Sequence, residues 1–301
     1  MTECLLCPRM CGVDREKAVG FCGAGRACEV SKIMLHHWEE PPISGPDPKD
    51  EAHGSGAIFF AHCSLGCVYC QNGKISRRSA RGESYSPDRL AAAMIDLEAS
   101  GAYNINLVTP THYADRLLEA VRMARENGLT IPVVWNTGGY ERPETIDMLR
   151  GTVDVFLTDF KYASPELAGR YSGTPDYPDF AARSLARMFE VTGPCVFDEN
   201  GMMRRGVIVR HLVLPGCRAD SADVLHKIAG TVPVSDVRLS LMAQYTPDFL
   251  PPPEDPDRWR SIRRKVTSYE YEQVAEEASR LGFTGWMQER SSATARFTPD
   301  F

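Results

Sequence analysis

The sequence has no apolar run long enough to cross a bilayer, and no charged and apolar leader pattern opens it. It has no excess of basic residues either: 34 Lys and Arg stand against 40 Asp and Glu, for a formal net charge of −6. Such a balance gives no electrostatic reason to expect nucleic acid or an anionic membrane as a partner. We therefore expect a soluble, cytoplasmic protein with no nucleic acid and no membrane among its partners.

Cysteine, by contrast, is plentiful, with ten residues in 301. Because the cytosol keeps thiols reduced, we expect these cysteines to bind metal rather than to form disulfides. The length suits one large α/β domain with a small appendage. We expect a Cys-rich extension and connector over residues 1–50, the core over 51–290 and a C-terminal tail over 291–301.

Three cysteines directly follow a short apolar run, Ala57–Ala61, that predicts a buried strand. Cys63, Cys67 and Cys70 are separated by three and then two residues, so a loop could bring their thiolates to one soft metal centre. Three protein ligands would leave a four-iron cluster with one open iron. Zinc is the alternative, but no fourth Cys or His lies close downstream. A buried cysteine stripe on a helix is disfavoured by Gly66.

A second group of cysteines lies at the N-terminus: Cys4, Cys7, Cys11 and Cys22. Four thiolates make a closed site, which suits a structural zinc or a fully ligated iron–sulfur cluster. The alternative is a set of small buried residues, of which Cys28 is an expected instance. The stretch 35–45 that follows, with adjacent His36 and His37, predicts a connector.

From Gly54 onward, strand and helix signals alternate. Strands are predicted at 57–61, 103–109, 131–136, 153–159, 207–214, 237–242 and 283–287. Helices are predicted from Pro87 to Gly101 and at 114–127, 143–150, 180–191, 221–228 and 269–281. This alternation implies a parallel sheet covered by helices. Six or seven units are too few for an eightfold barrel, so we expect a partial (β/α)6-type TIM barrel that is open at its side.

Polar residues follow the predicted strands, where a barrel of this kind carries its chemistry. They are Thr109 and His112, Asn136, Asp159 and Lys161, Arg210, and Gln244. Loops are polar in general, but these groups would gather on one rim. Together they predict a cofactor pocket.

The pattern C-x3-C-x-aromatic-C at Cys63–Cys70 resembles the radical S-adenosylmethionine (SAM) superfamily. The chain further resembles the iron–sulfur branch of the homologues of pyruvate formate-lyase-activating enzyme. The stretches that carry this resemblance are Cys7-Pro-Arg9 with Cys11 and Cys22, Glu39–Gly45, Gly54-Ser-Gly56, Cys63–Asn72, Asn104–His112, Asn136–Tyr140, Asp159-Phe-Lys161 and Met242–Tyr245. They extend over nearly the whole chain.

The resemblance implies that the cysteine loop holds a [4Fe–4S] cluster whose open iron chelates the amino and carboxylate groups of SAM. It implies that Asp159 and Lys161 contact the ribose region of SAM and that Arg210 contacts its carboxylate, a role that suits a planar guanidinium. The alternative for each is a salt bridge on the rim.

The sequence departs from the activating enzymes at the end of the second strand. Those enzymes carry Gly-Gly-Glu there and hold the SAM ammonium with it, whereas this chain has Thr109-Pro-Thr-His112. Hydroxyl and carbonyl oxygens could accept from an ammonium, but no carboxylate is present. We expect Thr109, Asn136 and Gln244 to complete the cofactor site. His112 is a candidate for proton transfer near pH 7, with a structural histidine as the alternative.

The expected function is that of a radical SAM enzyme, which cleaves SAM reductively to a 5′-deoxyadenosyl radical that abstracts hydrogen from a substrate. Its reductant would be an external flavodoxin- or ferredoxin-like protein. The substrate is expected to be a glycine of a partner protein, with a small molecule or peptide as the alternative. A non-catalytic iron–sulfur or metal-binding module is the third interpretation. The Pro-rich stretch Tyr245–Trp259 would either contact a partner or pack onto the barrel.

Overall fold

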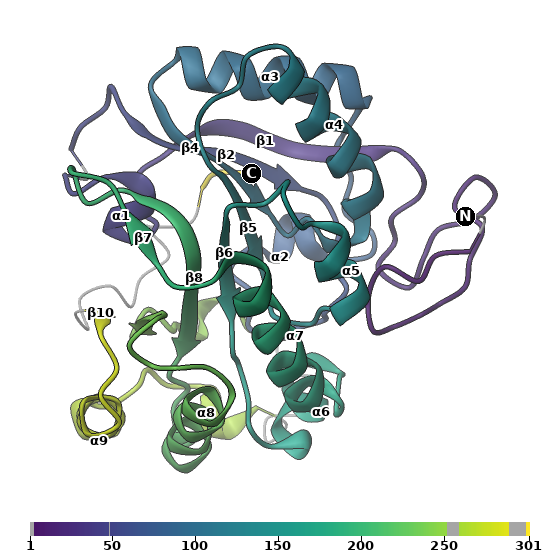
Figure 1. Cartoon of the computed structure of the whole chain (residues 1–301). Coiled ribbons are helices and arrows are strands. Elements are labelled where there is room, and N and C mark those ends of the chain that lie inside the picture. The colour runs from purple at the N-terminus through teal and green to yellow at the C-terminus, as the bar shows by residue number, and fades with distance from the viewer. Residues whose placement is uncertain (1–2, 48, 252–258, 289–298) are drawn as a thin grey trace.

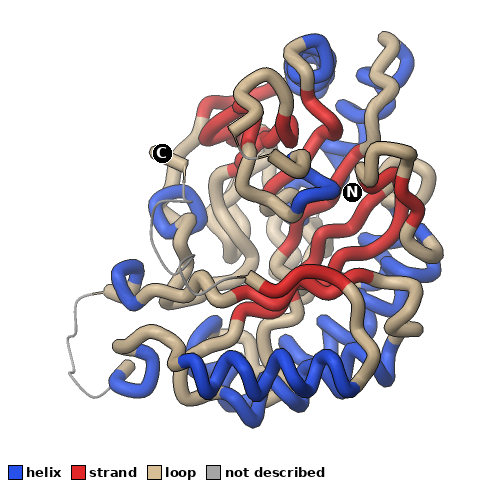
Figure 2. The backbone as a smooth tube through the Cα atoms, turned by 90° about the vertical axis from the view of Figure 1, so that its left-hand side faces the viewer, coloured by secondary structure: helices blue, strands red, loops and turns tan. Residues whose placement is uncertain are grey.

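The computed structural model describes residues 3–47, 49–251, 259–288 and 299–301. A long curved sheet forms its centre, and most of the helices cover the outer face of that sheet (Figure 1). Figure 2 shows the strands as one curving band, with helices outside it. None of the described helices is long and apolar enough to span a membrane.

Seven strands form the parallel part of the sheet. In spatial order they are β2 (Gly54–Phe60), β4 (Ala102–Val108), β5 (Val133–Thr137), β6 (Val155–Asp159), β8 (Met203–Leu212), β9 (Arg238–Met242) and β10 (Gly285–Met287). At the β2 end, β1 (Cys28–His36) pairs antiparallel with β2, and β3 (Glu83–Tyr85) pairs antiparallel with β1. The short β7 (Val196–Phe197) pairs antiparallel with β8.

The crossover helices follow the strands in chain order. They are α2 (Gly73–Ser76), α3 (Pro87–Ala99), α4 (Ala114–Glu126), α5 (Pro143–Met148), α6 (Pro165–Ser172), α7 (Tyr177–Thr192), α8 (Arg218–Thr231) and α9 (Ser268–Arg280), with 3-10 turns η1 (Thr111–Tyr113), η2 (Pro247–Phe249) and η3 (Arg260–Ile262). Among the described strands, β10 lies at one edge of the sheet and β3 at the other, so the sheet is not closed. The prediction of a partial barrel is confirmed.

The structure differs from the predicted elements mainly before residue 54 and after Asp159. The sequence analysis missed β1, in which Glu29, Ser31 and Lys32 interrupt the apolar residues, and it missed α6. Because β1 belongs to the sheet, we propose that the separate N-terminal lobe ends before Cys28 rather than at residue 50. Residues 289–298, which make up most of the expected tail, lie outside the described residues.

The predicted connector enters the barrel. Its short helix α1 (Pro41–Ser44) buries Ile43 completely against the inward side chains of β5, β6 and β8. These side chains are Val134, Val155, Leu157, Met203 and Ile208. The Asn104 side-chain amide of β4 donates to the Ile43 carbonyl at 2.6 Å. Residues 39–44 therefore plug the inside of the barrel and form a floor beneath the carboxyl ends of its strands.

Candidate active site

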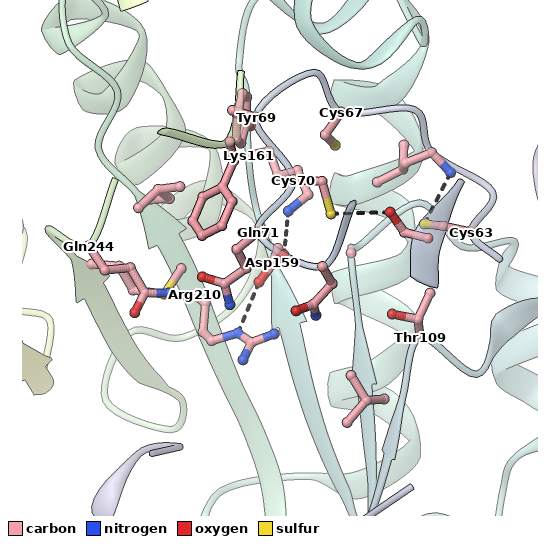
Figure 3. Close-up of a pocket in the computed structure, with 18 of the residues that line it drawn as sticks. Cys63, Cys67, Tyr69, Cys70, Gln71, Thr109, Asp159, Lys161, Arg210 and Gln244 are labelled. Atoms are coloured by element: carbon pink, nitrogen blue, oxygen red, sulfur yellow. Dashed lines mark hydrogen bonds and ion pairs between the residues drawn. The ribbon is translucent and has the colours of Figure 1, made fainter. Parts of the chain in front are cut away.

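The three cysteines after β2 face one cavity of about 180 Å³ at the carboxyl ends of the strands. Figure 3 shows Cys63, Cys67 and Cys70 around this pocket together with Asp159, Lys161 and Arg210. The Leu65 N–H donates to the Cys63 sulfur at 3.4 Å, and the Ser76 hydroxyl donates to the Cys70 sulfur at 3.4 Å. Burial, together with the nearby thiols of Cys67 and Cys70, raises the pKa of Cys63. Three neighbouring thiols with hydrogen-bond donors fit the three-cysteine site of a [4Fe–4S] cluster.

Backbone strain marks the same region. Among the described non-glycine residues, Met10, His62 and Thr109 have positive φ angles of 38°, 74° and 60°. Met10 directly precedes Cys11, His62 directly precedes Cys63, and Thr109 lines the cavity. Such conformations cost free energy in non-glycine residues, most of all in a β-branched one. Their positions favour a functional reason for the loop geometry.

A buried charge network joins β6 to β8 at the cavity. Asp159 pairs with the Lys161 ammonium and accepts from Arg210 Nε at 2.9 Å. Burial alone would raise the pKa of Asp159, but these two cations hold it below its usual value. Burial alone would lower the pKa of Lys161, but Asp159 and the Cys67 thiol hold it above its usual value. Both charges are thus retained inside the site.

The connector supplies a residue to this network that the sequence analysis treated only as part of a motif. Glu39 accepts from Arg210 Nη1 at 3.2 Å, from the Asn136 amide at 3.0 Å and from the Asn106 amide at 3.1 Å. Arg210 Nη2 also donates to Asn136 Oδ1 at 2.5 Å. Glu39 therefore reaches three strands from inside the barrel. Its position before a Pro-Pro pair was the only sequence signal.

Thr109, Asn136 and Gln244 all line the cavity, as do Asp159, Lys161 and Arg210. The Asn136 carbonyl accepts from the Thr109 N–H at 2.8 Å. The turn after Asn136 packs closely on β6, since a Cβ on Gly139 would lie 2.0 Å from the Asp159 carbonyl oxygen. The structure thus brings together all six residues expected at the cofactor site, and their role remains a proposal.

His112 lies elsewhere. It is fully buried, with Nε2 2.8 Å from the Ala61 carbonyl, and it does not line the cavity. Burial lowers the pKa of His112 to about 3, so the imidazole is neutral at pH 7. This geometry supports the structural alternative, and we do not carry the proton-transfer role forward.

The sequence analysis also missed Glu141, whose carboxyl lies next to Thr111 in the segment that replaces Gly-Gly-Glu. Glu141 is fully buried and accepts from the hydroxyls of Thr111 and Thr137. Burial raises the pKa of Glu141 to about 7, although these hydroxyls oppose the shift. Glu141 follows β5, one strand later than the expected position, and does not line the cavity. Its hydrogen bond with Thr111 joins it to the loop after β4.

The four N-terminal cysteines are close to one another. The Cys11 sulfur makes a hydrogen bond with Cys4, and both lie near Cys22. Burial, together with the neighbouring Cys22 and Cys4, raises the pKa of Cys7 to about 12. Backbone N–H groups of Arg9, Val13 and Ala24 donate to these sulfurs. The four cysteines thus lie in one neighbourhood, although their side chains do not converge on a single point as the ligands of one metal ion would.

Across the described ranges, no three His, Cys, Asp or Glu side chains converge as the ligands of a single metal ion. The described ends of the Pro-rich stretch after β9 pack on the barrel: Tyr245 and Trp259 are buried, and Leu250 packs against the core. Phe249 lines the cavity. Residues 252–258 of this loop lie outside the described residues.

An open parallel barrel carries three thiols and a network of paired charges at its strand ends, a setting that suits a metal–sulfur centre and a small charged cofactor. Residues 57–204 match the Radical SAM superfamily. Over 290 residues the chain is 30% identical to the uncharacterized protein MJ0674 of Methanocaldococcus jannaschii, covering 92% of this chain and 75% of that protein. The chain belongs to the radical SAM superfamily and is an enzyme with a [4Fe–4S] cluster and a SAM site.

Solved structures share the fold. Streptococcus suis SuiB bound to its precursor peptide SuiA has a TM-score of 0.53 and 13% identity, with 76% of this chain and 47% of SuiB covered. A radical SAM methyltransferase from Sphaerobacter thermophilus has a TM-score of 0.52 and 14% identity, with 78% of this chain and 66% of the methyltransferase covered. The chain thus spans about half the length of SuiB, and at these identities the likeness concerns the fold alone.

Proposed function

We propose that Cys63, Cys67 and Cys70 would hold a [4Fe–4S] cluster, and that this enzyme uses SAM bound beside them to abstract hydrogen from a substrate held inside the barrel. When bound and reduced, the cluster supplies one electron to the SAM sulfonium, which yields methionine and a 5′-deoxyadenosyl radical. The observation that supports this reading is the single cavity shared by the three thiols and the Asp159–Lys161–Arg210 network. An external one-electron reductant, flavodoxin- or ferredoxin-like, would reduce the cluster again after each cleavage of SAM.

The chain's own residues would hold the cofactor. Asp159 and Lys161 would face its ribose, and Arg210 would face its carboxylate through N–H groups beyond the three already paired. Thr109, held at positive φ, would offer oxygens to the ammonium. Asn136 and Gln244 would close the sides, and the buried surroundings would exclude water.

The test is anaerobic reconstitution of the wild type and of single Cys63→Ala, Cys67→Ala and Cys70→Ala variants. We expect each variant to lose reductive formation of 5′-deoxyadenosine. Cys195→Ala is the matched control, because Cys195 is a half-buried cysteine outside the cavity. Formation of 5′-deoxyadenosine at the wild-type rate by the three variants would refute the proposal.

For the substrate, we propose glycyl-radical activation of a partner protein as one candidate, supported by the resemblance to activating enzymes. An enzyme acting on a small molecule or peptide is the second candidate, supported by a further cavity beneath the cofactor site. An activase should consume about one SAM per partner and leave a persistent radical on it. Multiple turnovers that release a diffusible product would exclude the activase.

We also propose that Cys4, Cys7, Cys11 and Cys22 hold a separate metal, either zinc or a second iron–sulfur cluster. Their mutual proximity and their backbone N–H donors support this. Both metals accept four thiolates. Elemental analysis of the purified protein for zinc, iron and sulfide distinguishes them.

A further inference from the structure

A second cavity, of about 340 Å³, adjoins the cofactor site. The two share Asn136, Arg210, Met242 and Gln244 in their linings. The second cavity extends to the connector floor, where Glu39 and Glu40 line it. A molecule in this space would therefore lie directly beside the SAM site.

The charged side chains that line the two cavities are not all paired with one another. Three carboxylates, Asp159, Glu39 and Glu40, face two cations, Lys161 and Arg210. Lys161 pairs with Asp159, and Arg210 donates to Asp159 and Glu39. The field of Arg210 reaches Glu40, but its hydrogen bonds go elsewhere. Glu40 is thus left as the carboxyl without a cation of its own.

Glu40 is also short of a hydrogen-bond donor. Its side chain interacts with Ser240, yet its Oε2 is buried and has no partner among the described residues. The residue is only 8% exposed. Because burial is not offset by a paired cation, the pKa of Glu40 is raised. A buried carboxyl oxygen without a donor costs free energy, and a cationic ligand would remove that cost.

Aromatic walls suit the same kind of ligand. Trp38, before the connector helix, and Trp286, on β10, both line the cavity, and indole faces attract organic cations. We propose that this cavity is the substrate chamber, and that it takes a substrate carrying one ammonium or guanidinium group, seated on Glu40. This inference rests on the proposed function, because it assigns the substrate class of that site.

The cationic group could be the side-chain cation of free lysine or arginine, or that of a Lys or Arg residue in a peptide; norleucine lacks this side-chain cation in both settings. The experiment uses reconstituted holoprotein with SAM and measures binding calorimetrically. The probes are L-lysine and L-arginine against L-norleucine, and acetyl-Gly-Lys-Gly-amide against its norleucine counterpart. We expect at least tenfold tighter binding of the cationic member of one pair. The pair that discriminates shows whether the source is a free amino acid or a peptide.

The matched variants are Glu40→Gln, which keeps the shape and removes the charge, and Glu51→Gln, which changes an exposed acid after the connector. We expect Glu40→Gln to abolish the preference for the cation and Glu51→Gln to retain it, with cluster content unchanged in both. Equal binding of cationic and neutral probes by the wild type would overturn the inference, whether or not Glu40→Gln folds. So would an unchanged preference in folded Glu40→Gln.

The same preparations are assayed for reductive SAM cleavage. SAM cleavage without any preference for a cation would refute the chamber assignment alone. Preference for a cation without SAM cleavage in the reconstituted protein would refute the proposed function instead.

Discussion

Arg210 donates from three nitrogens to three residues, Asp159, Asn136 and Glu39, which come from two strands and the connector. Burial alone would lower the pKa of Arg210, but the carboxylates of Asp159, Glu39 and Glu40 hold it above its usual value. The guanidinium is therefore a fixed positive charge at the centre of the site. If Arg210 formed only a salt bridge on the rim, more of its guanidinium would be exposed to solvent. Its side chain is only 14% exposed.

We predict that Arg210→Ala raises the Kd for SAM by about ten- to a hundredfold, as expected for loss of charge-assisted hydrogen bonds. Iron and sulfide content should be unchanged, because Arg210 contacts none of the three thiols by hydrogen bond. Stability should also fall, by about 3–5 kcal/mol, since buried carboxylates lose their partner. Affinity is therefore measured per folded molecule.

The control for this variant is Arg204→Ala, on the same strand, whose side chain is 48% exposed and pairs with Asp198. It should leave SAM binding unchanged. A purely structural role for Arg210 would give the opposite result for Arg210→Ala: lost folding with unaltered SAM affinity in the folded fraction.

At the scale of elements, α9 is fixed to the rim by its first turn. Thr267 and Glu270 form a capping box, and Glu270 also accepts from Arg264 and from the Gly216 N–H after β8. The hydrogen bonds from Arg264 above all hold the pKa of Glu270 well below its usual value. Because the folded-state pKa is lowered, this carboxylate stabilises the fold above its unfolded-state pKa and loses that effect as the pH falls.

We predict that Glu270→Gln lowers the free energy of unfolding by about 1 kcal/mol at pH 7, a value kept small because Arg264 is partly exposed. The difference from the wild type should shrink as the pH falls below about 4.3. Urea unfolding at a series of pH values measures both. Glu276→Gln, an exposed acid on the same helix, should show no such pH dependence. A difference that grows on acidification would contradict the prediction.

The connector helix α1 acts as a core element although it has only four residues. We predict that Ile43→Ala lowers the free energy of unfolding by about 2–5 kcal/mol, because it opens a cavity among the inward side chains of three strands. Urea unfolding measures the loss. Val196→Ala, at a side chain 42% exposed, should cost less than about 0.5 kcal/mol. Equal effects of the two variants would show that Ile43 is not part of the barrel core.

At the scale of the whole molecule, the N-terminal lobe lies on the side of the barrel where α5 lies (Figure 1). Arg9 donates to the Ser64 carbonyl at 3.1 Å, next to Cys63. Arg142 and Thr145 of the α5 region donate to the carbonyls of Leu5 and Leu6 at 2.6 and 2.8 Å. A metal in this lobe would therefore stiffen a wall of the active site.

We predict that the variant with Cys63, Cys67 and Cys70 all changed to Ala retains either zinc or residual iron and sulfide. The metal should disappear when Cys4, Cys7, Cys11 and Cys22 are changed as well. Elemental analysis of purified protein decides this. Chelation should lower the thermal stability of the first variant, because binding at a small thiolate site contributes to folding. A folded first variant without zinc, iron or sulfide would rule out the second metal.

The sequence by itself determined the framework of this protein. The spacing of Cys63, Cys67 and Cys70 after an apolar run specified the loop, and the alternation of strands and helices specified the open barrel. The rim positions of Asp159, Lys161 and Arg210 followed, because parallel strands place their carboxyl ends together. These are consequences of local pattern and of one topological rule, so they could be predicted from the chain alone.

Only the tertiary structure decided what fills the barrel. Glu39 meets Asn136 and Arg210 across 97 and 171 residues of sequence, and Glu141 is hydrogen-bonded to the loop after the preceding strand. The same holds for His112, whose burial follows from the packing of neighbouring segments. Local periodicity carries no information about such contacts. They arise because a partial barrel leaves a hollow interior, and the chain closes it from below with residues that the sequence presents as a linker.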